Sequence, residues 1–418
     1  MTDQDLCGCD DYGMSRRSVL KAAALAAGAG VVTSMFGDVL TSTVYGASNA
    51  NVLVVVSLRG GCDGLSMVVP HAEPAYYAAR PRTAVAAGSL LHKDATFGLH
   101  PSFAPLSEHW TGGRLAAIQA VGMPVPNRSH FEAMELVEDA DPGSSARVGW
   151  LNRMVAGLAE APDLFDGVAL GSAITPTALQ GPAPSLATDS FGDLVGPFAD
   201  DAVLRRRVMG SLRTQYAAKG GLIGTAGVSA LALADRAATI AGEIKDGPEG
   251  GATYPKYSEL GEALSTTAGL IRANIGVKAV AVDLGGWDHH VDVDWRVKDK
   301  IGELASSLAA FHTDLGVDAD RVTIVTVSEF GRRLQENGSR GVDHGYGNVM
   351  LAMGAGVKGG SYYSRWPTLG VGKQVDGDLV VTTDYRSVLT EILRARFPTL
   401  DASRVFPGVS EDPLGFMA

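Results

Sequence analysis

The 418-residue sequence contains only three cysteines, at Cys7, Cys9 and Cys62. The first two lie in an N-terminal segment that we expect to be removed, so the mature chain keeps one cysteine and has no internal disulfide. No cysteine follows the apolar part of that segment, which argues against a lipid anchor. An exported protein without disulfides is the expected product of a chain that folds in the reducing cytoplasm before export.

Long, strongly apolar runs are also missing. Residues 22–36 form an apolar run near the N-terminus, but they are rich in Ala and Gly, and a membrane span needs about 20 strongly apolar residues. This run follows the sequence SRRSVLK at residues 15–21 and precedes small residues at Ala47, Ser48 and Ala50. The order is typical of a twin-arginine signal peptide. A membrane anchor or a general secretory signal is the alternative.

We therefore expect residues 1–50 to engage the twin-arginine translocation machinery. The mature protein is then extracytoplasmic, in the periplasm, the cell wall or the medium, with no stable membrane span. Basic residues are outnumbered, because 35 Lys and Arg stand against 46 Asp and Glu, a net charge of −11. This balance argues against nucleic acid as a partner.

No Pro/Ser-rich linker or long charge run divides the remaining chain, so residues 51–418 are expected to form one domain. Residues 51–58 (NVLVVVSL) predict a strand buried on both faces. Further strands are predicted at residues 115–121, 277–284 and 321–327, and weaker ones at 350–354 and 379–381. Helical patterns lie between them. The alternation predicts a three-layer α/β fold with a mostly parallel central sheet and helices on both faces. Three helical patterns without a strand predict a helical insertion over about residues 201–275.

Carboxylates and imidazoles follow several of these strands. In open α/β sheets ligands gather at the carboxyl ends of strands, and carboxylate and imidazole groups suit zinc, manganese or another divalent ion. The pattern predicts metal ligands at Asp63, Asp288, His290, Glu329 and His344. The roles of His130, His289 and Asp343 are left open.

Each of these residues also has a purely structural interpretation. Asp63 stands among glycines and could belong to a turn, and Glu329 could cap the turn at Gly331. Ser129 and Glu132 have the spacing of a capping box, although a helix N-terminus also favours a hydroxyl nucleophile or a bound anion.

Two arginines near these strand ends, Arg59 and Arg128, could bind an anionic substrate or pair with the carboxylates. Cys62 is a weak candidate for a nucleophile, because the neighbouring Asp63 would raise the pKa of its thiol.

Taken in order, five motifs resemble a bacterial family, domain of unknown function 1501, which is grouped with the alkaline phosphatase and sulfatase superfamily. They are LRGGCDGL at residues 58–65, NRSHFE at 127–132, GWDHH at 286–290, SEFGR at 328–332 and DHG at 343–345. The resemblance covers nearly all of the chain from about residue 51 onward. It implies an alkaline phosphatase-like, two-metal hydrolase scaffold.

Carried over by position, the resemblance makes Asp63 the ligand after the first strand and Ser129 the nucleophile. Asp288 and His290 are similar to the Asp/His pair of one metal site, and His344 to the last histidine ligand. Glu329 falls where the superfamily commonly has Asp followed by His. Two departures, Phe330 in place of that histidine and the short Asp288-x-His290 spacing, leave one or two divalent ions as the expectation.

The leading hypothesis is an exported metal-dependent hydrolase that acts on a small anionic phosphate or sulfate ester. Ser129 would attack the ester, and Arg128 or Arg59 would neutralise its charge. The sequence lacks the Cys-x-Pro-x-Arg pattern of formylglycine sulfatases. The alternatives are a non-catalytic binding or assembly module that retains the fold, and a mutase or phosphonate-type enzyme.

Overall fold

The computed structural model describes residues 50–141, 144, 146–199, 201–244 and 247–418. The signal peptide expected over residues 1–50 therefore lies, except for residue 50, outside the described residues. None of the helices in the described ranges combines the length and the apolar character that a membrane crossing requires.

A nine-stranded sheet forms the centre of the main unit of the described chain, in the order β12-β4-β11-β8-β1-β7-β5-β6, with β15 paired to β4. The strands are β1 (Val52–Leu58), β4 (Leu115–Gly122), β5 (Gly167–Leu170), β6 (Leu186–Thr188), β7 (Ala279–Leu284), β8 (Val322–Val327), β11 (Asn348–Gly354), β12 (Ser361–Tyr363) and β15 (Thr383–Asp384). Three two-stranded pairs lie outside it: β2 (Val68–Val69) with β3 (Gly98–Leu99), β9 (Arg332–Glu336) with β10 (Val342–His344), and β13 (Gln374–Val375) with β14 (Asp378–Leu379).

The sheet is mixed, which corrects the expectation of a mostly parallel sheet. β1 pairs in parallel with both β7 and β8, whereas β11 is antiparallel to both of its neighbours, β8 and β4. The physical reason is the connection between β8 and β11. A parallel neighbour needs a crossover, usually a helix, but the chain between these strands contains only the β9-β10 pair. It therefore enters β11 from the edge at which β8 ended.

The central strand β1 is buried along its whole length. Its β-branched side chains suit a pleated surface that is covered on both sides. Val54 lies beside Val280 of β7 on one side and Ile324 of β8 on the other. The carboxyl ends of these three parallel strands therefore meet at one edge of the sheet.

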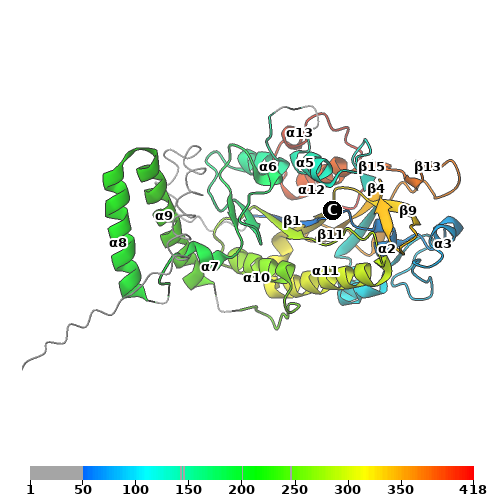
Figure 1. Cartoon of the computed structure of the whole chain (residues 1–418), viewed down its shortest axis with the longest axis horizontal. Helices are drawn as coiled ribbons and strands as arrows, with labels where there is room; N and C mark the ends of the chain where they lie inside the picture. The colour runs from blue at the N-terminus through cyan, green and yellow to red at the C-terminus, as the bar shows by residue number, and fades with distance from the viewer. Residues whose placement is uncertain (1–49, 142–143, 145, 200, 245–246) are drawn as a thin grey trace, which may run out of the picture. The chain divides into compact units, whose positions relative to one another are not determined.

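Helices cover both faces of the sheet (Figure 1), as the sequence predicted. One face carries α10 (Glu259–Arg272) and α11 (Val293–Leu315), and the other carries α5 (His130–Asp139), α6 (Trp150–Leu158), α12 (Tyr385–Arg396) and α13 (Ala402–Val405). Leu53 and Val55 of β1 join one buried cluster with Trp150 of α6 and Ile392 of α12. Shorter elements are α2 (Gly64–Met67), α3 (Pro74–Ala79), α4 (Ser107–Thr111), α7 (Phe191–Leu194), η1 (Pro101–Leu106), η2 (Thr177–Leu179) and η3 (Gly316–Arg321).

A second compact unit includes residues Gly192–Ala241 and contains α8 (Ala202–Lys219) and most of α9 (Gly221–Glu243). Met209, Leu231 and Ala234 form its small core. The insertion expected over residues 201–275 is thus divided, because α10 packs against α11 and β7 in the main unit instead.

Candidate metal centre

Side chains from three distant segments meet beyond the carboxyl ends of β7 and β8. His130 is the first residue of α5, and Asp288 and His290 lie in the loop between β7 and α11. His344 is the last residue of β10. Each of these segments is short and is attached to a helix or strand with buried residues. The positions of these elements therefore determine where the side chains point.

Four side-chain atoms converge. His344 Nε2 lies 2.9 Å from His130 Nε2 and 3.2 Å from Asp288 Oδ1, and the last two atoms are 3.5 Å apart. His290 Nε2 lies 3.0 Å from both His344 Nε2 and Asp288 Oδ1. Two ligands of a tetrahedral ion lie about 3.3 Å apart, since bonds of about 2.0 Å meet at the tetrahedral angle. His130, Asp288 and His344 therefore form a group that could hold a metal ion, and His290 flanks it.

The other ring nitrogen of each histidine has a partner that accepts a hydrogen bond. Nδ1 of His130 lies 3.0 Å from Glu329 Oε1, Nδ1 of His290 lies 2.7 Å from Asp343 Oδ1, and Nδ1 of His344 lies 2.9 Å from the carbonyl oxygen of Arg128. Ionised carboxylates and carbonyls only accept, so each Nδ1 carries the proton. This pattern is typical of metal-binding histidines. The lone pairs of His130 and His344 then face each other and an oxygen of Asp288, with the Nε2 of His290 beside the last two, and a divalent cation would satisfy this arrangement.

Arg332 supplies the counter-charge of the cluster. Its guanidinium is fully buried and donates to Asp288 Oδ1 at 2.6 Å. It also donates to the carbonyl oxygens of Gly60, Gly61 and Val342. One side chain thus ties together the loops after β1 and β7 and the strand that carries His344.

The protonation states suit metal binding. Burial alone would raise the pKa of Asp288, but the hydrogen bond and charge of Arg332 outweigh it and lower the pKa to about 2. Burial, followed by the charge of Arg332, holds the pKa of His344 below its usual value. Near neutral pH the carboxylate is ionised and the His344 ring is neutral, the forms in which both residues bind metals.

Glu329, expected as a metal ligand, contacts the outer nitrogen of His130 and places no oxygen among the converging atoms. Its Oε1 accepts from Gly60 N at 2.7 Å and contacts His130 Nδ1, and its Oε2 accepts from Ser328 Oγ at 3.1 Å. The carboxylate is buried and its oxygens are engaged. This carboxylate therefore orients the ring of His130.

Asp63, also expected as a ligand, is paired elsewhere. Its two oxygens accept from the guanidinium of Arg80 at 2.5 and 2.9 Å, and both side chains are buried. Burial would raise the pKa of Asp63, but the charge and hydrogen bonds of Arg80 keep it below its usual value. With both oxygens occupied by a buried cation, Asp63 stands outside the cluster, and the metal-ligand assignment is corrected to a structural one.

Ser129 immediately precedes His130 and is exposed at the N-cap of α5. Its side chain makes no capping hydrogen bond, so the capping box with Glu132 is not formed. The backbone N–H of Ser129 donates to Asn127 Oδ1 at 2.9 Å. The hydroxyl is thus exposed and not engaged in capping at a helix N-terminus, beside a residue of the cluster.

The two arginines have different surroundings. Arg59 donates to Asp283 at 2.6 Å and to Glu138 at 2.7 Å, so two carboxylates neutralise it. Arg128 binds the buried Asp378 at 2.5 Å, and its carbonyl group holds the His344 ring. Arg128 is therefore the nearer of the two to the cluster, because it is two residues from His130 and contacts His344 directly.

Cys62 and His289 lie near the cluster in sequence but take no part in it. Burial raises the pKa of the Cys62 thiol to about 12, which excludes a reactive thiolate at neutral pH. His289 is buried, and burial followed by the Arg332 charge lowers its pKa to about 4. Its Nδ1 has no hydrogen-bond partner among the described residues.

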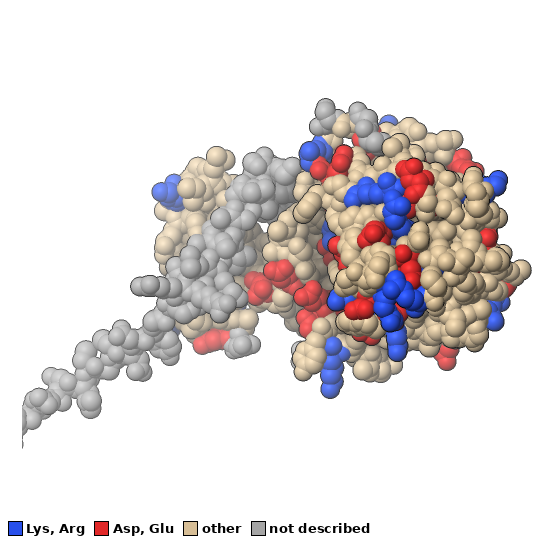
Figure 2. Space-filling view, turned by 45° about the vertical axis from the view of Figure 1, so that its right-hand side comes forward, with Lys and Arg blue, Asp and Glu red and all other residues tan. Residues whose placement is uncertain are grey.

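Figure 2 shows one face of the molecule, on which acidic and basic side chains are interspersed in one area. A face with both signs creates no strong field of one sign.

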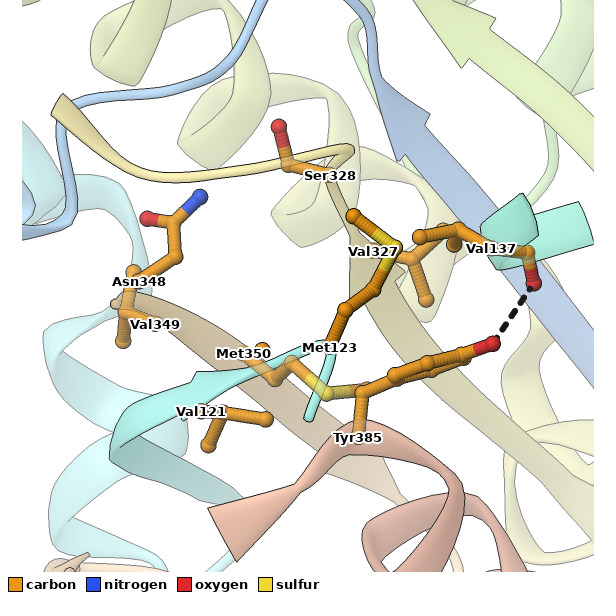
Figure 3. A pocket seen from close by; sticks show the side chains of 10 residues that line it. Val121, Met123, Val137, Val327, Ser328, Asn348, Val349, Met350 and Tyr385 are labelled. Carbon is orange, nitrogen blue, oxygen red and sulfur yellow. Dashed lines mark hydrogen bonds between the residues drawn. The ribbon is translucent and has the colours of Figure 1, made fainter. Parts of the chain in front are cut away.

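A small pocket lies beside Ser328 (Figure 3). Met123, Val137, Met350 and Tyr385 give it an apolar lining. None of the four converging residues lines it, so it is separate from the cluster.

Sequence reasoning missed three parts of the site. The sequence leaves the roles of His130 and Asp343 open, although each adjoins a predicted site residue, and that adjacency is the available signal. Asp343 orients His290 through a hydrogen bond, and Asn337 donates to the same Asp343 oxygen at 3.0 Å. Arg332 ends the SEFGR motif, and no signal in the sequence marks it as a contact of Asp288.

Comparison with known proteins finds a family model that matches part of the chain and distant similarity to solved structures. The family model described as "Protein of unknown function (DUF1501)" matches residues 243–404, which include Asp288, His290, Glu329 and His344, and this supports the resemblance to that family. The crystal structure of the C-terminal periplasmic domain of EcEptC from Escherichia coli, in complex with Zn, is similar at 9% identity, with 75% of each chain covered and a TM-score of 0.34. The likeness is distant, and nothing about the site rests on it. No curated protein matches the chain.

Proposed function

We propose that this protein is an exported metal-dependent hydrolase of phosphate or sulfate esters on an alkaline phosphatase-like scaffold. The observation that carries the proposal is the convergence of His130, Asp288 and His344, with His290 beside the last two and the outer nitrogen of each ring held by an acceptor. Two imidazoles and one carboxylate, with a third imidazole alongside, favour zinc, and manganese is the second choice. Export rests on the signal sequence.

Ser129 is the proposed nucleophile. Its Oγ would bond to the phosphorus or sulfur atom while the bond from that atom to the alcohol oxygen breaks, and the proton lost by the Ser129 hydroxyl is balanced by the one that the departing alcohol takes up through solvent. Water would then hydrolyse the Ser129 ester, release inorganic phosphate or sulfate and restore the hydroxyl. A bound divalent ion supplies Lewis-acid stabilisation of the developing negative charge. The first N–H groups of α5 have no acceptor within the helix and lie at the positive end of its dipole, so they favour the anionic group. Arg128 is the proposed cationic contact.

The test uses mature protein purified without chelators. We expect about one equivalent of zinc or manganese, which Asp288→Asn and His344→Ala should lose. Ser129→Ala should keep the metal but lose hydrolysis of p-nitrophenyl phosphate or sulfate by about 10³-fold or more. Ser211→Ala, at an exposed serine of α8, is the matched control and should be unchanged. Hydrolysis that persists in Ser129→Ala would refute the nucleophile, and folded protein without stoichiometric metal would refute the metal site.

One observation favours the non-catalytic alternative, a binding or assembly module. The ring of Phe330 packs 4.9 Å from the rings of both His130 and His344. An apolar ring therefore occupies the position where the related superfamily commonly places a histidine. If wild-type protein binds the metal but hydrolyses no ester above the level of Ser129→Ala, this alternative replaces the hydrolase.

A further inference from the structure

We infer that the ester substrate carries a large apolar alcohol group, which lies on an apolar rim around the metal cluster. The rim is defined by Val125, Phe131, Val291 and Trp295. This inference rests on the proposed function, because the rim is assigned to the same site.

The first observation is where the exposed apolar side chains of the main unit lie. Within the described part of that unit, half of the exposed large apolar side chains belong to the rim, and each is within five residues of His130 or His290. Phe131, which follows His130, is 92% exposed, and Trp295 is 52% exposed. Single exposed apolar residues are ordinary on protein surfaces, but a concentration of them beside polar groups marks a binding site.

The second observation is that the segment carrying Val125 is fixed next to His344. The hydroxyl of Tyr346, two residues after His344, donates to the carbonyl oxygens of Met123 and Pro124 at 2.9 and 2.8 Å. The short loop that presents Val125 is therefore held by the same chain segment that supplies a residue of the cluster.

The third observation concerns the segment that carries Val291 and Trp295. Val293 N donates to Arg340 O at 2.8 Å, and Arg340 Nη2 pairs with Asp294 at 2.6 Å. These contacts attach the start of α11 to the chain that leads into β10 and His344. The segments that carry Val125, Val291 and Trp295 are thus held by contacts of neighbouring residues, and not by burial of the rim side chains themselves.

The chemistry of the rim matches one class of substrate. A sugar or glycerol ester would bring hydroxyl groups against side chains of which only Trp295 carries a hydrogen-bonding group, its indole N–H, so such an alcohol gains little. An ester of a long alkyl or other extended apolar alcohol would place its anionic head at the cluster and its chain on the rim. The apolar group would remove both surfaces from water.

The experiment measures binding separately from turnover, with phosphonates that cannot be hydrolysed at an ester bond. Zinc-loaded mature protein is titrated with dodecylphosphonate and with ethylphosphonate, below the micelle concentration, by calorimetry and by tryptophan fluorescence, and a Trp295→Phe variant identifies the part of the signal that comes from Trp295 among the five tryptophans. We expect dodecylphosphonate to bind at least about 10-fold more tightly, because pocket contacts with a few methylenes give discrimination of this order. Phe131→Ser should reduce the preference by about 10-fold without changing the zinc content.

Val317→Ser is the matched control, since Val317 is exposed at η3 and outside the rim, and it should keep the preference. Equal affinity for the two phosphonates, or no binding of either, would overturn the inference, as would an equal loss in Phe131→Ser and Val317→Ser. Chain-length preference in a protein that hydrolyses no ester would sustain the rim and refute the hydrolase. Hydrolysis without chain-length preference would support the hydrolase and refute the rim. An unchanged Trp295 signal together with self-association of the protein through Phe131 would assign the rim to a second copy of the chain.

Discussion

Replacing Asp63 by Asn separates its two possible roles. The Asp63–Arg80 pair is bidentate, and the exposed fractions of the two side chains are 1% and 0%. Removing one charge of such a pair leaves the other buried without a partner, which costs about 3–5 kcal/mol. We therefore expect Asp63→Asn to lower the free energy of unfolding in urea by about this amount while zinc affinity at the cluster stays within about threefold.

The pH dependence follows from the sign of the shift. Arg80 holds the pKa of Asp63 below its usual value, so the stabilisation is present above the ordinary pKa of about 3.9 and is lost as the pH falls through the folded-state pKa. The penalty of Asp63→Asn should be equal at pH 8 and pH 6 and shrink only below about pH 4.

Two controls complete this test. Asp412→Asn removes an exposed partner of Arg365 and should cost less than about 1 kcal/mol. Adding Arg80→Met to Asp63→Asn should recover part of the loss, because the stranded cation is gone. Loss of zinc with unchanged stability would refute this reasoning and restore Asp63 as a metal ligand.

Three further predictions concern the surroundings of the cluster. Glu329→Gln and Asp343→Asn should each weaken zinc binding by about 10–100-fold, because they orient histidines; competition with a chelator measures this, and an unchanged affinity would contradict it. Arg332→Lys should lower the free energy of unfolding by about 1–3 kcal/mol, since one ammonium cannot serve all its acceptors, and wild-type stability in urea would contradict the clamp. Burial raises the pKa of Cys62 to about 12, so a thiol reagent at pH 8 should label Cys62 only in unfolding urea, and rapid labelling of folded protein would show that the thiol is accessible.

The long buried strands could be predicted from sequence, because continuous runs of β-branched residues are typical of strands that are buried on both faces. The predicted strands at residues 51–58 and 321–327 correspond to β1 and β8 to within one residue. β5 and β6 were missed because they span only Gly167–Leu170 and Leu186–Thr188, too short for a periodic signal. The direction of β11 depends on how the chain leaves β8, which local sequence does not encode.

The sequence could predict which strand ends carry candidate site residues, but not which of those residues meet in the cluster. Asp288, His290 and His344 meet in the structure because each follows or ends an element at one edge. Asp63 has the same kind of position but finds Arg80, which lies 17 residues away. Glu329 reaches a histidine 199 residues away instead of the cluster itself. Contacts between residues so far apart in the sequence are decided by tertiary packing. The residue type alone could therefore not distinguish a metal ligand from a residue that only contacts one.

The cluster joins parts of the chain that are far apart, since His130 and His344 are separated by 214 residues. An ion held between them would be a cross-link that closes a very long loop, in a structure whose only described cysteine is the free Cys62. Closing a loop of even 100 residues restricts the unfolded chain by about 4.7 kcal/mol in the entropic treatment of disulfides. If the protein is exported as proposed, metal binding would then govern its resistance to extracellular proteases as well as its chemistry, and scarcity of the metal would shorten the protein's lifetime.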